Sequence, residues 1–149
     1  MEPPKVTVEI STKNRYDVLS NCLQSIVLQT HKPHRVIIFD DSDNPIDLRQ
    51  DCRYSNLFRM MELKGILWEV VFGQRIGQVA NHQKALEMAQ TPFVWRVDDD
   101  NIVEPNVLQR LMRHTLNDKV GAVASCVLHP GAKFHPNSTS GKIEDCNFK

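Results

Sequence analysis

Three consecutive carboxylates, Asp98, Asp99 and Asp100, directly follow an apolar run in the stretch FVWRVDDDNIVEP. Neighbouring like charges repel one another and lose hydration when they are buried, so their clustering needs a physical explanation. A divalent cation is one explanation, because Mg²⁺ and Mn²⁺ bind carboxylate and water oxygens and leave positions open for substrate phosphates. A solvated acidic turn before the helix near Pro105 is the other, since the helix dipole favours carboxylates there. The charge pattern alone leaves both explanations open.

The spacing of the three aspartates predicts how they divide their roles. Alternate residues of an extended segment point to the same side, so Asp98 and Asp100 are expected to share one side and to bind the metal. Asp99 is then expected to face elsewhere, for instance toward a sugar hydroxyl.

A second acidic cluster ends the apolar run RVIIF. Asp40 and Asp41 follow that run directly, and a carboxylate there can accept a hydrogen bond from a base N–H or a ribose hydroxyl. Asp43 lies in SDNP, which is also good turn chemistry, so a plain turn is the alternative. Arg75 and Lys84 could balance the charge of a diphosphate, although a solvated surface position is the favoured interpretation of each residue taken singly.

The elements that must position these side chains alternate along the chain. Short apolar runs with strand character are separated by segments with helical spacing, which predicts an α/β fold with a doubly wound, mostly parallel, Rossmann-like sheet in three α/β/α layers. The polar clusters follow predicted strands directly, so they should converge on one rim, where such sheets bind ligands. The predicted strands are 6–11, 36–39, 66–72, 91–97 and 121–128. The predicted helices are 18–28, 47–61, 78–89 and one that begins near Pro105. Asn14 or Asp17 is expected to cap the first helix, the third has Val79, Leu86 and Ala89 on one side, and the last has Val107, Leu108, Leu111 and Met112 on its apolar face.

Composition narrows the class of protein. The chain has 149 residues, 41% of them hydrophobic and 24% charged, which predicts a single globular domain over 1–149 with an irregular tail at 129–149. The formal net charge of +0 argues against a nucleic-acid partner or an anionic membrane surface. No apolar run approaches the roughly 20 residues of an integral membrane segment, and no signal peptide is visible. The four cysteines form no CxxC pair, so a reduced, cytoplasmic protein is expected.

One further cluster has metal-ligand chemistry. Cys126, His129, His135 and Cys146 contain suitable donors for zinc, but their spacing matches no tight structural-zinc pattern. A buried thiol with loop histidines is the favoured interpretation. The sequence leaves open whether His129 or His135 also adds a ligand to the aspartate site.

Two long stretches resemble family 2 glycosyltransferases with the A-type fold. VTVEISTKNRYDVLSNCLQSIVLQTHKPHRVIIFDDSD is similar to the family's opening strand, Asn-Arg loop, helix ending in Gln-Thr, and strand ending in an acidic turn. GQVANHQKALEMAQTPFVWRVDDDN is similar to the following helix, strand and Asp-x-Asp (DxD) signature. The matching residues of the first stretch are Ser11, Asn14, Arg15, Gln29, Thr30, Asp40, Asp41 and Ser42.

The resemblance implies a transferase that moves a sugar from a nucleotide-diphosphate donor to an acceptor hydroxyl with inversion, helped by Mn²⁺ or Mg²⁺. It implies that Ser11 and Asp41 contact the base and that the aspartate segment holds ribose and metal. The acceptor could be a glycan, a lipid or a small molecule. The nucleotide-sugar-binding residues expected on this basis are Ser11, Asn14, Arg15, Asp41, Arg75, Asp98 and Asp99, and the metal ligands are Asp98 and Asp100.

The sequence also departs from the family pattern. His82 and Gln83 occupy the positions of an Arg-Asn pair, and Glu9 replaces an apolar strand residue. The chain is expected to be truncated relative to the family, so the catalytic residue stays unknown. The pair Glu144 and Asp145 comes too soon after the aspartates to be the usual base. The base would come from the tail, from missing sequence, or from a homo-oligomer or another partner chain.

Two other functions remain alternatives. The first is a catalytically incomplete nucleotide-sugar-binding module. The second is a non-enzymatic, doubly wound, Mg²⁺-binding signalling or scaffold domain. Phospho-receiver domains carry their acidic residues after the first and third strands, whereas the pairs here follow the second and fourth predicted strands, which argues against the second alternative.

Overall fold

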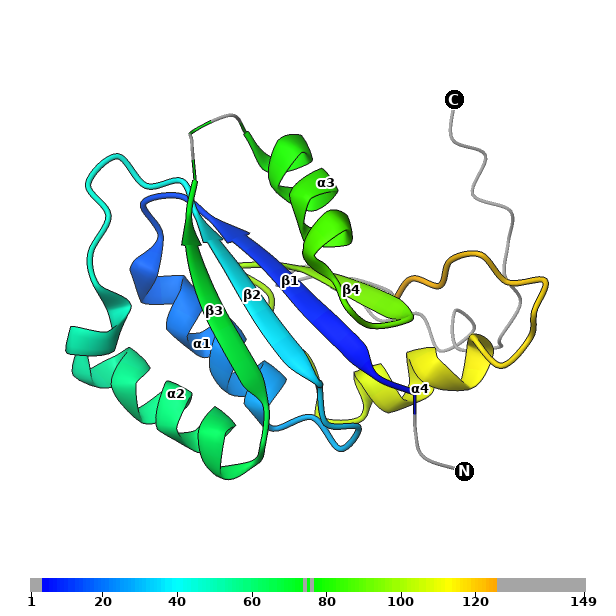
Figure 1. Ribbon diagram of the computed structural model, residues 1–149. Helices are drawn as coiled ribbons and strands as arrows, with labels where there is room; N and C mark the ends of the chain where they lie inside the picture. Colours follow the sequence, from blue (N-terminus) through cyan, green and yellow to red (C-terminus); the bar gives the residue numbers. More distant parts are fainter. Residues whose placement is uncertain (1–3, 74, 76, 126–149) are drawn as a thin grey trace, which may run out of the picture.

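Parallel strands and helices alternate along the chain (Figure 1). The structure is a computed structural model and describes residues 4–73, 75 and 77–125. The predicted α/β fold is confirmed. Its elements are β1 (Val6–Thr12), α1 (Tyr16–Val27), β2 (Arg35–Asp40), the 3₁₀ helix η1 (Leu48–Gln50), α2 (Cys52–Leu63), β3 (Leu67–Phe72), α3 (Gln78–Met88), β4 (Phe93–Asp98) and α4 (Val107–His114).

The sheet has the strand order β3-β2-β1-β4, and all its pairs are parallel. The chain moves from β1 outward to β2 and β3, and then returns to the other side of β1 with β4. Strand order therefore reverses between β1 and β4, where Ser11 is in register with Asp98. In a doubly wound sheet the crevice beyond the carboxyl ends of such strands is where ligands bind.

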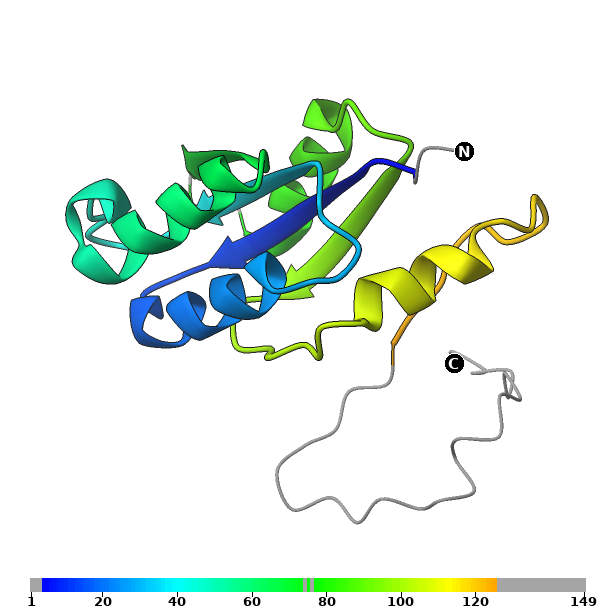
Figure 2. The ribbon, with the colours of Figure 1, turned by 90° about the horizontal axis from the view of Figure 1, so that it is seen from below.

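Helices cover both faces of the sheet, which confirms the predicted three layers. Val36 and Ile38 of β2 pack with residues of α1 and α2 on one face, whereas Ile37 and Phe39 pack with Ala85 of α3 on the other. Figure 2 shows α3 on the opposite side of the sheet from α1 and α4. The alternation is the expected consequence of the two-residue period of a strand.

The two hydrophobic clusters on the α1 face share one side chain. The main cluster lies under α1 and α2 and includes Val8 and Ile10, and a smaller one joins Val6 to Leu108 of α4. Trp95 of β4 packs against both clusters. Among the described residues no helix has the length and apolar composition of a membrane span.

Gln29, just after α1, ties down the segment that leads into α4. Its side chain is buried, its Nε2 donates to the carbonyl of Glu104 (2.8 Å), and its Oε1 accepts from the N–H of Leu108 (3.0 Å). The N-cap residue of α4, Asn106, makes no side-chain capping bond. The start of α4 is therefore capped by Gln29 and not by the three aspartates, which removes the helix-capping explanation of their clustering.

We expect Gln29→Ala to lower the free energy of unfolding by about 1–3 kcal/mol, because it removes the hydrogen-bond partner of the buried N–H of Leu108. Urea denaturation followed by circular dichroism measures the change. Gln83→Ala is the matched control, because the Gln83 amide bonds only to Glu87 on an exposed helix surface. Equal losses in the two variants would contradict the proposed role of Gln29.

Two predicted helices begin differently from the sequence expectation. Neither Asn14 nor Asp17 caps α1; Arg15 is its N-cap residue and makes no side-chain capping bond. The predicted helix over 47–61 is divided, because Asp51 takes an extended conformation and caps α2 through the N–H of Arg53. The hydrogen bond from the Arg53 N–H to the Asp51 side chain thus replaces a continuous helix at this point.

The predicted apolar side of α3 is wrong. Val79 and Leu86 are 83% and 58% exposed, while Asn81 and Ala85 are buried. The helix is turned so that polar side chains reach carboxylates of the sheet: Asn81 bonds to Asp41, and the next residue bonds to Glu9.

The predicted fifth strand is not formed in its described part, because residues 121–125 carry no regular secondary structure. Residues 126–128 lie outside the described residues. Within the described chain β4 pairs only with β1, so 121–125 lack the strand partner that a ladder of hydrogen bonds requires.

Candidate functional site

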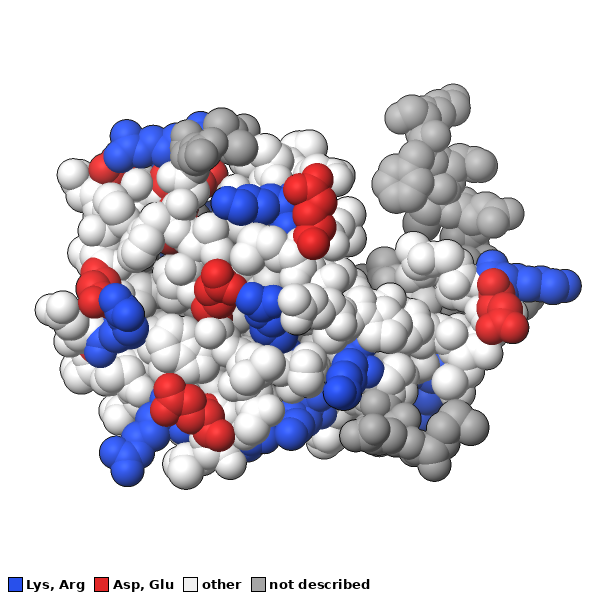
Figure 3. All heavy atoms as spheres, viewed as in Figure 1, with Lys and Arg blue, Asp and Glu red and all other residues white. Residues whose placement is uncertain are grey.

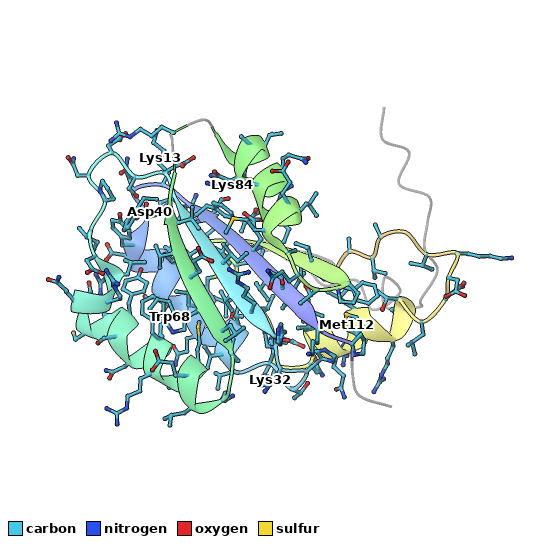
Figure 4. The ribbon with its side chains drawn as sticks, in the orientation of Figure 1. Lys13, Lys32, Asp40, Trp68, Lys84 and Met112 are labelled. Atoms are coloured by element: carbon cyan, nitrogen blue, oxygen red, sulfur yellow. The ribbon has the colours of Figure 1, made fainter. Side chains whose placement is uncertain are left out.

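The polar loops after the strands meet at one edge of the sheet, as the sequence predicts. Hydrogen bonds join the loop after β1 to the loops after β2 and β4. Figure 4 shows Lys13 and Asp40 at this edge, and Lys32 and Met112 at the opposite one. We call this edge, formed by residues 11–15, 40–43, 73, 75 and 98–100, the carboxyl rim.

The loop after β1 is fixed by Asn14, which has a positive φ of 57°. Its Nδ2 donates to Asp43 Oδ2 (2.6 Å), its Oδ1 accepts from the N–H of Asp43 (2.9 Å), and its own N–H donates to Ser42 Oγ (2.8 Å). The hydrogen bond from Asn14 and the charge of Lys13 lower the pKa of Asp43. The Asn14 amide, expected at the nucleotide sugar, here locks the loop to the end of β2.

The three aspartates at the end of β4 differ in burial. Asp99 is only 5% exposed, and its Oδ2 accepts from Thr12 Oγ1 (2.7 Å). The side chains of Asp98 and Asp100 are 52% and 54% exposed. Burial raises the pKa of Asp99, because removing a carboxylate from water disfavours its charged form. The inner aspartate is thus part of the fold, and the outer two face solvent.

Arg15 carries the cation closest to the cluster. Its Nη2 lies 2.6 Å from Asp99 Oδ1 and 2.7 Å from Asp100 Oδ2. The hydrogen bond to Asp100 and the charge of Asp99 raise the pKa of Arg15. Asp98 has weaker partners, since Gln78 Nε2 is 3.3 Å and Arg96 Nη2 3.7 Å from its Oδ1. One guanidinium therefore bridges two of the three carboxylates.

The outer aspartates have the donor chemistry of a hard-cation site. In the described part of the chain no three Asp, Glu, His or Cys side chains gather as a complete ligand set. Asp98 and Asp100 are the two carboxylates of the cluster that are exposed to solvent, and a cation bound there would also take water and phosphate oxygens. That set fits Mg²⁺ or Mn²⁺, which commonly keep waters and bind through one or two carboxylates. Cys126, His129, His135 and Cys146 of the considered zinc cluster lie outside the described residues.

Asp41 is held on the α3 side of the rim. Its side chain is buried, and its Oδ2 accepts from Asn81 Nδ2 (2.9 Å). Its Oδ1 is buried and has no hydrogen-bond partner among the described residues. Gly73, after β3, packs directly on Oδ1, because a Cβ built on Gly73 would overlap that oxygen and lie 2.7 Å from Asp41 Cγ. An unpaired buried carboxylate oxygen is costly unless a donor reaches it.

Glu9 is unusual in the sequence, but its hydrogen-bond partners could not be identified there. Glu9 is buried, and it accepts from Ser11 Oγ (2.7 Å) and pairs with His82 Nδ1 (2.8 Å). A buried carboxylate in a strand requires hydrogen-bond donors. Glu9 in a predicted buried strand could therefore have indicated that a polar side chain of another element packs against it. Because Ser11 donates to Glu9, its hydroxyl keeps only acceptor positions for a ligand. Asn81 and Thr12 were missed because the carboxylates they bind are distant in sequence.

The two other basic residues considered for a diphosphate lie at the surface. Arg75 has a φ of 57° and donates from Nη2 to the carbonyl of Asp43 (2.5 Å). Lys84 is exposed on α3 (Figure 4). On the face shown in Figure 3, acidic and basic side chains are interspersed. Glu144 and Asp145, the considered base pair, lie outside the described residues.

A parallel sheet that is covered by helices on both faces and has acidic loops at its topological switch point defines an α/β domain of the Rossmann-like class. Residues 7–147 match the model of the family "Glycosyl transferase family 2". The chain therefore belongs to glycosyl transferase family 2, which confirms the resemblance seen in its sequence. Membership does not favour the alternative of a signalling or scaffold domain.

Known proteins agree with this assignment. The chain is 26% identical over 126 residues to "Putative glycosyltransferase EpsH" of Bacillus subtilis (strain 168), covering 83% of this chain and 33% of that protein. The mannosyltransferase PcManGT from Pyrobaculum calidifontis, solved with GDP-Man and Mn²⁺, is 25% identical with a TM-score of 0.68, covering 87% of this chain and 37% of that one. TarS of S. aureus, residues 1–349 with UDP-GlcNAc, shares the fold at 21% identity and a TM-score of 0.53, covering 71% and 29%. The chain thus spans about a third of the length of each.

Proposed function

We propose that this chain forms the donor-binding half of a glycosyltransferase that moves a sugar from a nucleotide diphosphate to an acceptor hydroxyl with inversion. The observation that carries the proposal is the carboxyl rim of a family 2 chain, where Asp98 and Asp100 are exposed and one oxygen of the buried Asp41 has no hydrogen-bond partner among the described residues. The likeness to PcManGT, whose structure contains GDP-Man and Mn²⁺, supports a nucleotide-sugar donor and a divalent cation.

Each rim residue has a role in this proposal. Asp41 Oδ1 and the acceptor lone pairs of Ser11 receive N–H groups of the base. Asp99 positions Thr12 and Arg15 beneath the ribose and diphosphate. Arg15 and Arg75 carry the guanidinium groups of the rim, which suit the charge of a diphosphate.

Asp98 and Asp100 would hold Mn²⁺ or Mg²⁺, which supplies charge stabilisation to the departing nucleoside diphosphate when it is bound. The acceptor hydroxyl attacks the anomeric carbon from the face opposite the diphosphate while a carboxylate base takes its proton. In this proposal no described residue is the base, which comes from the tail, from further sequence or from a partner chain, including a second copy.

Calorimetric titration with GDP, UDP and dTDP sugars, each with and without Mn²⁺, tests the proposal. We expect one nucleotide class to bind and its affinity to depend on the metal. Absence of binding to all three classes would refute a donor site. Release of nucleoside diphosphate with glycan, lipid or small-molecule acceptors then separates a complete enzyme from a catalytically incomplete binding module.

A further inference from the structure

Arg15 contacts a carboxylate for which a metal ion would compete. Its guanidinium bridges Asp99 and Asp100 at 2.6 and 2.7 Å, and Asp100 is one of the two carboxylates assigned to the cation. A guanidinium already satisfies much of the charge of the carboxylates that it bridges. A cation that approaches Asp100 must therefore either displace Arg15 or share a carboxylate with it.

The backbone holds Arg15 in place while leaving its side chain movable. Arg15 is the N-cap residue of α1, and its carbonyl accepts from the N–H groups of Val18 and Leu19. The preceding Asn14 is locked to Asp43. The side chain of Arg15 is nevertheless 47% exposed, so the guanidinium can leave Asp100 without opening the core. The backbone of Arg15 is thus held in place, while its guanidinium can change partner.

We propose that Arg15 is the resident counter-cation of the aspartate cluster and moves from Asp100 to the diphosphate when the metal and nucleotide bind. The inference rests on the proposed function. A metal ion arriving alone must either displace Arg15 into solvent or share Asp100 with it, whereas a metal–nucleotide complex brings phosphate oxygens that accept both cations. The protein therefore binds metal and nucleotide together and takes up free metal poorly. Arg15 is a positioning residue that sets this order of binding.

The test is a Mn²⁺ titration of the full chain without nucleotide, followed by the EPR signal of free Mn²⁺. We expect Arg15→Met to bind Mn²⁺ at least about tenfold more tightly than the unaltered chain, because the competing cation is gone. With the preferred nucleotide diphosphate added, the unaltered chain should gain more Mn²⁺ affinity than Arg15→Met, since it alone can transfer a guanidinium to the phosphates. Circular dichroism confirms that the variant is folded.

Arg96→Met is the matched control, because it removes the same charge next to the same cluster from a position 3.7 Å from Asp98. General electrostatics would tighten Mn²⁺ binding equally in both variants, so an Arg15→Met effect within twofold of Arg96→Met overturns the inference. Arg15→Lys provides a second check. It keeps the competing positive charge, and because one nitrogen, Nη2, makes both contacts, we expect its Mn²⁺ affinity to be nearer to that of the unaltered chain than to that of Arg15→Met. Failure of all nucleotides to bind would overturn the proposed function but leaves the Mn²⁺ comparison readable.

Discussion

Replacing Asp98 and Asp100 together by asparagine is expected to weaken Mn²⁺-dependent nucleotide binding at least about 100-fold, which corresponds to about 2.7 kcal/mol. Asparagine keeps the shape of the side chain but removes the charge that a hard cation requires. Both side chains are about half exposed, so the loss should come from the site and not from unfolding. Calorimetry with and without Mn²⁺ measures it.

The double variant needs a control that changes charge but leaves the rim intact. Asp118→Asn, in the exposed segment after α4, removes a carboxylate away from the rim and should leave the affinity unchanged. Asp99 is left intact in the experiment because it is buried and bonded to Thr12. Mn²⁺-dependent binding that survives in the double variant would show that the metal is held elsewhere.

Gly73→Ala is expected to weaken nucleotide binding about 10- to 100-fold, with or without Mn²⁺. A Cβ at this position would lie 2.7 Å from Asp41 Cγ and 3.4 Å from the carbonyl oxygen of Asp40, closer than real Cβ contacts allow for Cγ. The Asp41 carboxylate must therefore swing away, breaking its bond to Asn81 and leaving the position where it would accept from the base. The range corresponds to about 1.4–2.7 kcal/mol, the scale of one charge-assisted hydrogen bond.

Gly121→Ala is the matched substitution, since a Cβ on Gly121 meets no atom of the described residues within 4 Å. It should bind nucleotide like the unaltered chain. Thermal unfolding of both variants separates local displacement from loss of the fold. If Gly73→Ala is folded and binds normally, Asp41 does not contact the base.

Most of the scaffold could be predicted because strand periodicity and strand ends are local properties of a sequence. The segments that became β1, β2, β3 and β4 showed alternating or continuous apolar residues. Polar clusters followed the first, second and fourth of them, so the convergence on one rim followed from parallel topology. Helix orientation was less predictable: the face that α3 buries is chosen by carboxylates on the strands, which its own pattern of Val79 and Leu86 could not reveal.

The internal geometry of the rim could not be predicted for a related reason. Alternation predicted that Asp99 points away from Asp98 and Asp100, but the burial of Asp99 against Thr12 did not follow from alternation. The bridge from Arg15 did not follow either, because it depends on the left-handed conformation of Asn14 and on a reciprocal bond to Asp43, 29 positions away. Distant side-chain pairs of this kind set which carboxylate oxygens remain free, and no periodicity encodes them.

Because Trp95 packs against two hydrophobic clusters, its fluorescence can report on the unfolding of both. The chain contains two tryptophans; Trp68 stacks on Phe58 beside α2, with ring centroids 4.0 Å apart (Figure 4), whereas Trp95 lies against both the α1 and the α4 clusters. With Trp68 replaced by phenylalanine, the remaining indole emission reports on both clusters from a single position. One red shift, coincident with the loss of helical ellipticity, would show that the domain melts as one cooperative unit.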